Sequence, residues 1–166
     1  MKMIKPTRLL CTAALLAGLN AVSLNVYAVT GAIKVTSIAE TDVEVMKAGK
    51  KEIKRIPLSK AVPGTEVILT TRFENVSDKT ATGVTINNPI AKELEYKAGS
   101  AFGADCEILF SADEGKTFAA AESLKIKVAE GERNALPKEY THVRWIYKGQ
   151  LAAGKASEVG FRAIIK

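Results

Sequence analysis

Cys106 and His142 are the only cysteine and the only histidine after residue 28, and a thiolate beside an imidazole is a known nucleophile-base pair. Cys106 alternates in phase with Ile108 and Phe110, which is typical of a small buried side chain on a strand. His142 lies three residues before Trp145, on the other face of its strand. We therefore expect a packed thiol and no catalytic residue. A thiol-dependent or hydrolytic periplasmic enzyme stays open, and it requires both side chains within hydrogen-bonding distance.

A dense basic run could bind an anionic polymer. The run consists of Lys47, Lys50, Lys51, Lys54 and Arg55, and Glu52 is the only acidic residue within it. Such a cluster can contact lipopolysaccharide or a cell-wall polymer, and it is equally typical of a solvated loop or of an edge strand that lysines protect from pairing. Whether the Lys47–Arg55 segment binds a polyanion is left open. No nucleic-acid partner is expected.

Trp145 and Tyr147 would form a carbohydrate platform if they faced outward. They alternate in phase with Val143, and large aromatic residues dominate the cores of β-sandwiches, so we expect them in the core.

Two short polar motifs are interpreted as turns. Asp113-Glu114-Gly115 lacks the spaced acidic ligands of a calcium loop and supplies the positive φ that a hairpin before Phe118 needs. Asn75-Val76-Ser77 fits a glycosylation sequon but is flanked like a turn. No metal and no cofactor is expected.

The chain begins with a typical secretory signal. Three basic residues precede an apolar run from Leu9 to Leu19, and the small-residue ending Val26-Tyr27-Ala28 follows. The run is shorter than the roughly 20 residues that span a bilayer, so no retained membrane span is expected. Cleavage is predicted after Ala28, which makes residues 1–28 a signal peptide and places the protein in the periplasm or outside the cell.

The remaining residues, 29–166, have the size of one domain with its own hydrophobic core. Three of the 24 basic residues and none of the 18 acidic ones lie in the signal, so the net charge falls from +6 to 21 − 18 = +3. Cys106 remains as a single thiol, which excludes an internal disulfide.

The apolar pattern after Gly31 has mostly period two, which predicts an all-β domain. Pro63-Gly64 precedes a strand in which Val67, Leu69, Thr71 and Phe73 share the core face, while Glu66, Ile68, Thr70 and Arg72 share a mostly wet face. Further strands are predicted around Val84–Asn87, Cys106–Phe110, Leu124–Val128, Val143–Tyr147 and Val159–Ile165.

One or two strands are expected in Ala32–Val45, a basic loop in Met46–Lys54, and a loop in Ala129–Glu139. These segments give about seven to nine short strands. Antiparallel strands of this kind must pack against a second sheet, so we expect an immunoglobulin-like antiparallel β-sandwich with Greek-key links.

The segment VPGTEVILTTRFENVSDKTATGVTINNPIAKELEYKAGSA resembles the DUF11 repeat family of bacterial exported and surface proteins. The matching positions are Pro63-Gly64, Val67, Asn75, Ala81, Val84, Pro89, Tyr96 and Gly99-Ser100. Leu69 and Asn88-Pro89-Ile90 depart from the pattern, and one module is present where the family often has several. The resemblance implies an immunoglobulin-like sandwich with a structural or binding role and no catalytic residues.

The sequence therefore predicts an exported, non-catalytic interaction module of the bacterial cell envelope that binds through edge strands or loops. The expected partner is an envelope protein or a surface polymer. As a further alternative, the protein is a subunit of a surface assembly in which the terminal strand Glu158–Ile165 pairs with a neighbour's open edge.

Overall fold

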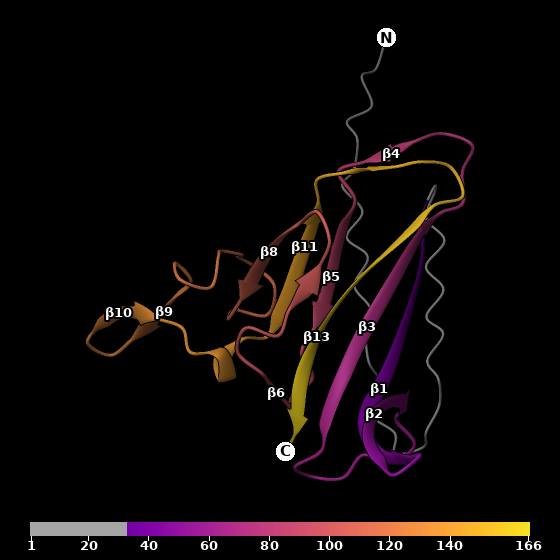
Figure 1. Ribbon diagram of the computed structural model, residues 1–166. Helices are drawn as coiled ribbons and strands as arrows, with labels where there is room; N and C mark the ends of the chain where they lie inside the picture. Colours follow the sequence, from indigo (N-terminus) through magenta and orange to yellow (C-terminus); the bar gives the residue numbers. More distant parts are fainter. Residues whose placement is uncertain (1–32) are drawn as a thin grey trace.

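The computed structural model describes residues 33–166, so the predicted signal peptide and the cleavage after Ala28 lie outside the described residues. The described chain is all-β apart from one turn of 3₁₀ helix, η1 (Pro137–Glu139) (Figure 1). The strands are β1 (Ile33–Lys47), β2 (Lys50–Pro57), β3 (Glu66–Asn75), β4 (Ala81–Thr82), β5 (Thr85–Pro89), β6 (Leu94–Tyr96), β7 (Phe102–Gly103), β8 (Cys106–Ser111), β9 (Lys125–Val128), β10 (Gly131–Asn134), β11 (His142–Tyr147), β12 (Gln150–Leu151) and β13 (Ala156–Ile165). This number exceeds the predicted seven to nine partly because several strands are only two or three residues long.

Two antiparallel sheets form a β-sandwich-like structure. The larger sheet has the order β2-β1-β3-β13-β6, with β7 also paired to β13, and the smaller sheet has the order β5-β11-β8. The last two long strands, β11 and β13, enter the middle of the two sheets, between partners that are far away in the sequence. Completing either sheet therefore requires the C-terminal third of the chain.

The core lies between the sheets and contains the residues that the alternation predicts. Val143 and Trp145 of β11 and Val159 and Phe161 of β13 are 0% exposed, as is Phe73 of β3. The Trp145 and Phe161 rings stack across the two sheets with their centroids 6.3 Å apart. Both rings are among the largest fully buried side chains, so their contact helps to set how the two sheets face each other.

The expected wet face of β3 is wrong at Ile68 and Thr70, which are 1% and 7% exposed. β3 lies between β1 and β13, and Thr70 is opposite Gly160 in the register. A Cβ at Gly160 would lie 2.5 Å from Phe102 Cζ, so the Phe102 ring packs directly on this glycine. An aromatic ring thus covers part of the outer face beside Thr70.

The prediction of a core strand in Leu124–Val128 and of a loop in Ala129–Glu139 needs correction. β9 and β10 pair only with each other among the described strands and form a ribbon that projects from the body (Figure 1). Leu124 is buried at its base, whereas Val128 is 39% exposed near its tip. The apolar residues of this segment alternate as in a core strand, but only those at the base of the ribbon reach the core.

The predicted basic loop Met46–Lys54 is also wrong, because this segment is a β-hairpin. β1 pairs with β2 from Glu40↔Pro57 to Lys47↔Lys50, which leaves the two-residue connection Ala48-Gly49. Both residues have positive φ, 49° and 78°, as the tight hairpin turn with a right-handed twist requires. The sequence did not indicate this hairpin because many of its side chains are charged and exposed, so apolar and polar residues do not alternate as they do in a strand with one buried face.

Candidate interaction surfaces

Cys106 and His142 are not brought together. Cys106 lies opposite Tyr147, and His142 lies opposite Ser111, at the two ends of the β8–β11 pair. Five residues of extended strand separate these positions, which is about 17 Å. A nucleophile and its base need about 3 Å between heavy atoms, so the two residues do not form a dyad.

Cys106 lies in an open depression of about 460 Å³ that Gly103, Asp105, Glu107, Lys148 and Gly149 also line. Its Sγ donates to the Ala104 carbonyl at 3.3 Å. Burial, aided by the charge of Asp105, raises the pKa of the Cys106 thiol above its ordinary value. The protonated thiol is a much weaker nucleophile than the thiolate. The depression therefore holds an unactivated cysteine.

A second cavity, of about 310 Å³, has a mostly apolar lining. It is bordered by Tyr96, Ile108, Phe110, Pro137 and Tyr140, together with small residues of the neighbouring loops. The Tyr96, Phe110 and Tyr140 ring centroids are 4.7 to 5.5 Å apart, so the rings form one packed cluster. This volume is at the lower end of the range for small-molecule sites.

Trp145 is in the core and cannot offer a carbohydrate platform, because none of its surface is exposed. Tyr147 is partly buried against the same core and meets the Phe73 ring edge-on at 5.6 Å. Trp145 Nε1 is buried without a hydrogen-bond acceptor among the described residues. The prediction that these aromatic residues pack in the core is confirmed for Trp145.

Both predicted turns are present. Glu114 and Gly115 have positive φ, 61° and 81°, and Asp113 accepts hydrogen bonds from the backbone and the hydroxyl of Thr117 at 2.6 to 3.1 Å. These bonds lower the pKa of Asp113 to about 2. Within residues 33–166 no group of three or more His, Cys, Asp or Glu side chains is placed to hold a metal ion.

The sequon residue Asn75 is fully buried. Its Nδ2 donates to the carbonyls of Lys79 and Leu151, and its Oδ1 accepts from the backbone and hydroxyl of Ser77. All hydrogen-bonding capacity of the amide is therefore used inside the fold. The motif is a structural turn, and its side-chain nitrogen is inaccessible in the folded protein.

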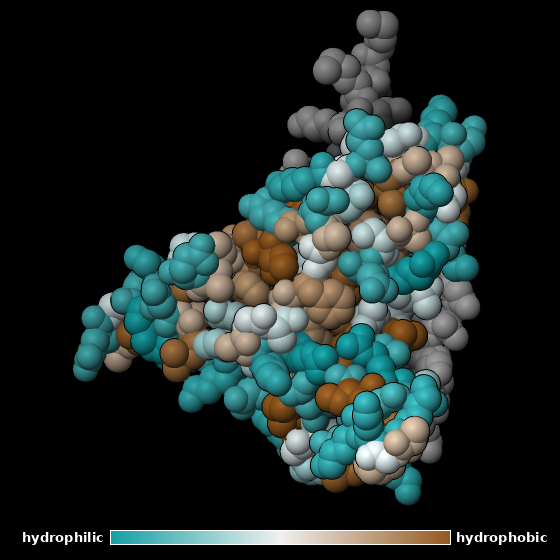
Figure 2. Space-filling model, viewed as in Figure 1, coloured by the Kyte–Doolittle hydropathy of each residue, from teal (hydrophilic) through white to brown (hydrophobic). Residues whose placement is uncertain are grey.

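The β1–β2 hairpin extends beyond the sandwich. β1 pairs with β3 only as far as Glu40↔Ile68, so the segment Val43–Lys54 pairs with itself alone among the described strands. We call this segment the β1–β2 arm. Figure 1 shows it at the end of the larger sheet where β3 begins, and Figure 2 shows brown surface among teal surface at that end.

The arm is much less basic than the isolated cluster in the sequence indicates. The arm itself contains four cations of the cluster and two acids, Glu44 and Glu52, so its net charge is 4 − 2 = +2. The longer paired segment Glu40–Pro57 contains five cations and four acids, which gives 5 − 4 = +1. Lys51 contacts Glu44 at 2.8 Å, and Arg55 contacts Asp42 at 3.3 Å. Acidic side chains of β1 thus offset the cations of β2, which weakens the case for a polyanion site.

One face of the arm exposes two large apolar side chains. Met46 is 69% exposed and Ile53 is 73% exposed, and the register places them diagonally across from each other. The Lys51–Glu44 ion pair lies on the same face, because Lys51 is opposite Met46 and Glu44 is opposite Ile53. The face therefore combines two apolar side chains with a neutralised ion pair.

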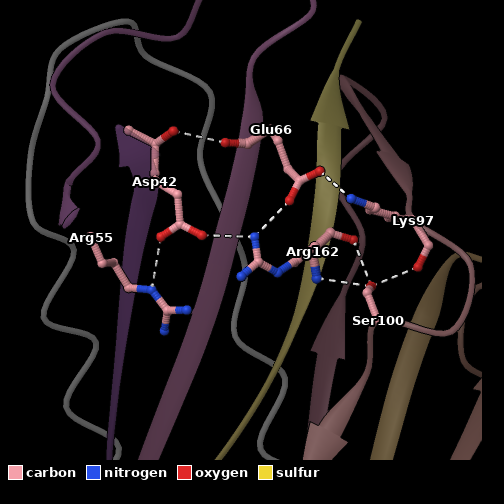
Figure 3. A network of polar contacts seen from close by, with 7 residues as sticks. Asp42, Arg55, Glu66, Lys97, Ser100 and Arg162 are labelled. Atoms are coloured by element: carbon pink, nitrogen blue, oxygen red, sulfur yellow. Dashed lines mark hydrogen bonds and ion pairs between the residues drawn. The ribbon is translucent and has the colours of Figure 1, made fainter. Parts of the chain in front are cut away.

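A network of charged residues joins the base of the arm to the sandwich (Figure 3). Arg162 of β13 contacts Asp42 of β1 at 2.9 Å and Glu66 of β3 at 2.7 Å. Lys97 contacts the other carboxylate oxygen of Glu66 at 2.5 Å, and Arg55 of β2 extends the network to the edge strand. The contacts cross four strands and orient the arm relative to the larger sheet.

The charges of this network reinforce one another. Hydrogen bonds from Lys97 and then Arg162 lower the pKa of Glu66. Burial acts to raise the pKa of Asp42, but hydrogen bonds from Arg162 and Arg55 outweigh it and hold the pKa below its ordinary value. Sequence patterns gave no sign of this network, because Arg162 is 120 residues from Asp42.

The terminal strand β13 has strand partners on both of its edges within the protein. β3 pairs with it from Ala156 to Ile164 on one side, and β7 and β6 pair with it on the other. It also supplies the buried core residues Val159 and Phe161. Donation of this strand to a neighbouring subunit would open both the sheet and the core.

Comparisons with known protein families, curated proteins and solved structures give no match. None of the helices in the described part of the chain is long and apolar enough to cross a membrane.

Proposed function

We propose that this protein is an exported, non-catalytic interaction module of the bacterial envelope, with an immunoglobulin-like fold, which binds an envelope protein through the β1–β2 arm. The observation that carries the proposal is the exposure of Met46 and Ile53 on one face of the arm. The separation of Cys106 from His142 along the β8–β11 pair supports a role without catalysis.

The energetics of the arm favour a partner protein over an anionic polymer. A two-stranded ribbon is only marginally stable by itself, and two large apolar side chains in water add nothing to its stability. The network of Asp42, Glu66 and Arg162 nevertheless holds its base in a fixed orientation. A rigid base with an apolar, nearly neutral face suits contact with a protein surface.

Strand addition through β13 is not favoured, because that strand already has partners on both edges. β2 is an edge strand of the larger sheet among the described strands, but its three lysines and its arginine protect it against pairing with another strand. We therefore assign binding to the side chains on the face of the arm.

Site-specific photo-crosslinking in the producing cell tests the proposal. A photoreactive phenylalanine analogue at Ile53 should give one discrete crosslinked envelope protein. The same analogue at Val128 is the matched control, because Val128 is an exposed apolar residue on the other projecting ribbon. No discrete product from Ile53, or the same product from both positions, would contradict binding through the arm.

A further inference from the structure

The outer face of the smaller sheet carries a polar cluster formed by β5, β11 and the turn after β8. Val143 and Trp145 point into the core, so the alternating residues His142 and Arg144 of β11 point outward. Asn87 of β5 is directly opposite Arg144 in the register. Phe118, at the end of the turn that Asp113 stabilises, completes the cluster.

Two contacts fix the guanidinium group of Arg144. Its Cζ lies 3.5 Å from the centroid of the Phe118 ring, so the cation packs on the face of the ring. Its Nε donates to Asn87 Oδ1 at 2.7 Å. Together, the stacking and the hydrogen bond set the plane of the guanidinium and its rotation within that plane.

The two terminal nitrogens of Arg144 have no hydrogen-bond partner and no ion pair within residues 33–166. Arg144 is nevertheless partly buried, and burial lowers its pKa because no carboxylate compensates. The contrast is Arg133, whose terminal nitrogens bind both carboxylate oxygens of Glu139 at 2.8 and 2.6 Å. The guanidinium of Arg133 is therefore paired with a carboxylate, whereas the guanidinium of Arg144 is oriented but has no acceptor for its terminal nitrogens among the described residues.

Neighbouring groups fit a hydrogen-bonding ligand. The amide nitrogen of Asn87 has no acceptor in the described structure, so it remains a donor beside Arg144. Burial and the charge of Arg144 lower the pKa of His142 against the opposing charges of Asp113 and Glu114, so the neutral imidazole is favoured. The Asp113 carboxylate is itself occupied by Thr117 and Ser111.

We propose that Arg144 binds a carboxylate group of a ligand through its two terminal nitrogens, with Asn87 as an additional donor. A planar carboxylate matches the parallel N–H groups of a guanidinium, and fixing the side chain in advance reduces the entropy lost on binding. The ligand carries its carboxylate as a peptide C-terminus or as a uronic acid. This site is on the outer face of the smaller sheet and does not depend on the arm.

NMR titration of the folded protein tests this site, with the Nε–Hε signals of Arg144 and Arg133 as reporters. The probes are N-acetylglycine and glucuronate, and their uncharged counterparts are N-acetylglycinamide and glucose. At least one carboxylate probe should shift the Arg144 signal saturably in the millimolar range, while Arg133 stays unchanged. The probe that binds tighter identifies the peptide or the sugar source.

The variant Arg144→Lys keeps the positive charge but loses the planar guanidinium, so its affinity for the active probe should fall at least about tenfold. This affinity is read from the side-chain amide signals of Asn87, which both proteins contain. The core signals of Trp145 report whether this variant is folded. If neither carboxylate probe gives a saturable shift in the wild-type protein, that result by itself overturns the proposal. Equal shifts with the uncharged probes, or unchanged affinity in Arg144→Lys, would also overturn it.

Discussion

Replacement of Asp113 by asparagine should destabilise the protein at neutral pH and much less in acid. The Asp113 carboxylate accepts hydrogen bonds from Thr117, Ser111 and the backbone of Lys116, and its pKa is about 2 against an ordinary 3.8. The depressed pKa means that the folded state favours the charged form. Its contribution is therefore complete above the unfolded pKa and is lost as the pH falls through the folded pKa.

The pKa difference of about 1.8 corresponds to at most about 2.4 kcal/mol, because one pKa unit is about 1.36 kcal/mol. Asp113 is partly exposed, and solvent screening reduces this to about 1 kcal/mol. Urea denaturation at pH 7 should therefore show Asp113→Asn less stable than the wild type by about 1 kcal/mol. The difference should decline from about pH 5 and nearly disappear at about pH 2.

The matched control is Glu114→Gln, which removes a carboxylate from the same turn. The Glu114 side chain accepts no hydrogen bond from the described residues, so this variant should match the wild type at both pH values. Glu139, whose pKa is also about 2, titrates in the same range in every variant and cancels in the difference. Equal stability of Asp113→Asn and wild type at pH 7, or a deficit that persists at pH 2, would refute the reasoning.

Three further predictions concern the core, the ionic network and the thiol. Phe161→Ala should cost about 3–5 kcal/mol in urea denaturation because it leaves a cavity between the sheets, and a loss below 1 kcal/mol would place Phe161 outside the core. Arg162→Met should lower stability by about 1–2 kcal/mol at pH 7, and the deficit should shrink below pH 4 as Asp42 and Glu66 become protonated, whereas a pH-independent deficit would argue against the network. Iodoacetamide should modify Cys106 more slowly in the folded protein than in urea, and faster reaction when folded would indicate an activated thiolate.

The sandwich-like arrangement was predictable from local alternation wherever one face of a strand meets the core. Val143 and Trp145, and likewise Val159 and Phe161, repeat every second residue and are buried as expected. The outer face of β3 was not predictable, because the burial of Thr70 beside Gly160 depends on the distant residue Phe102. Period-two patterns describe one strand and carry no information about what covers its other face.

The candidate surfaces were harder to predict than the core. The arm has charged residues on both strands, so the apolar pattern indicated a loop, although a small residue followed by glycine at Ala48-Gly49 was an available sign of a tight turn. The sequence gives no sign of the Arg144 site, because the orientation of its guanidinium depends on Phe118 and Asn87, which contact it from other parts of the chain. Contacts of this kind are set by register, which a single sequence does not reveal.

The most direct test of binding through the arm is the dissociation constant for the envelope protein that crosslinks at Ile53. Burial of Met46 and Ile53 in a complex is worth about 3 kcal/mol together, so the double variant Met46→Ser with Ile53→Ser should bind about 100-fold more weakly by calorimetry. Val128→Ser should bind like the wild type. An unchanged dissociation constant in the double variant, or equal weakening by Val128→Ser, would contradict the assignment of partner binding to the arm.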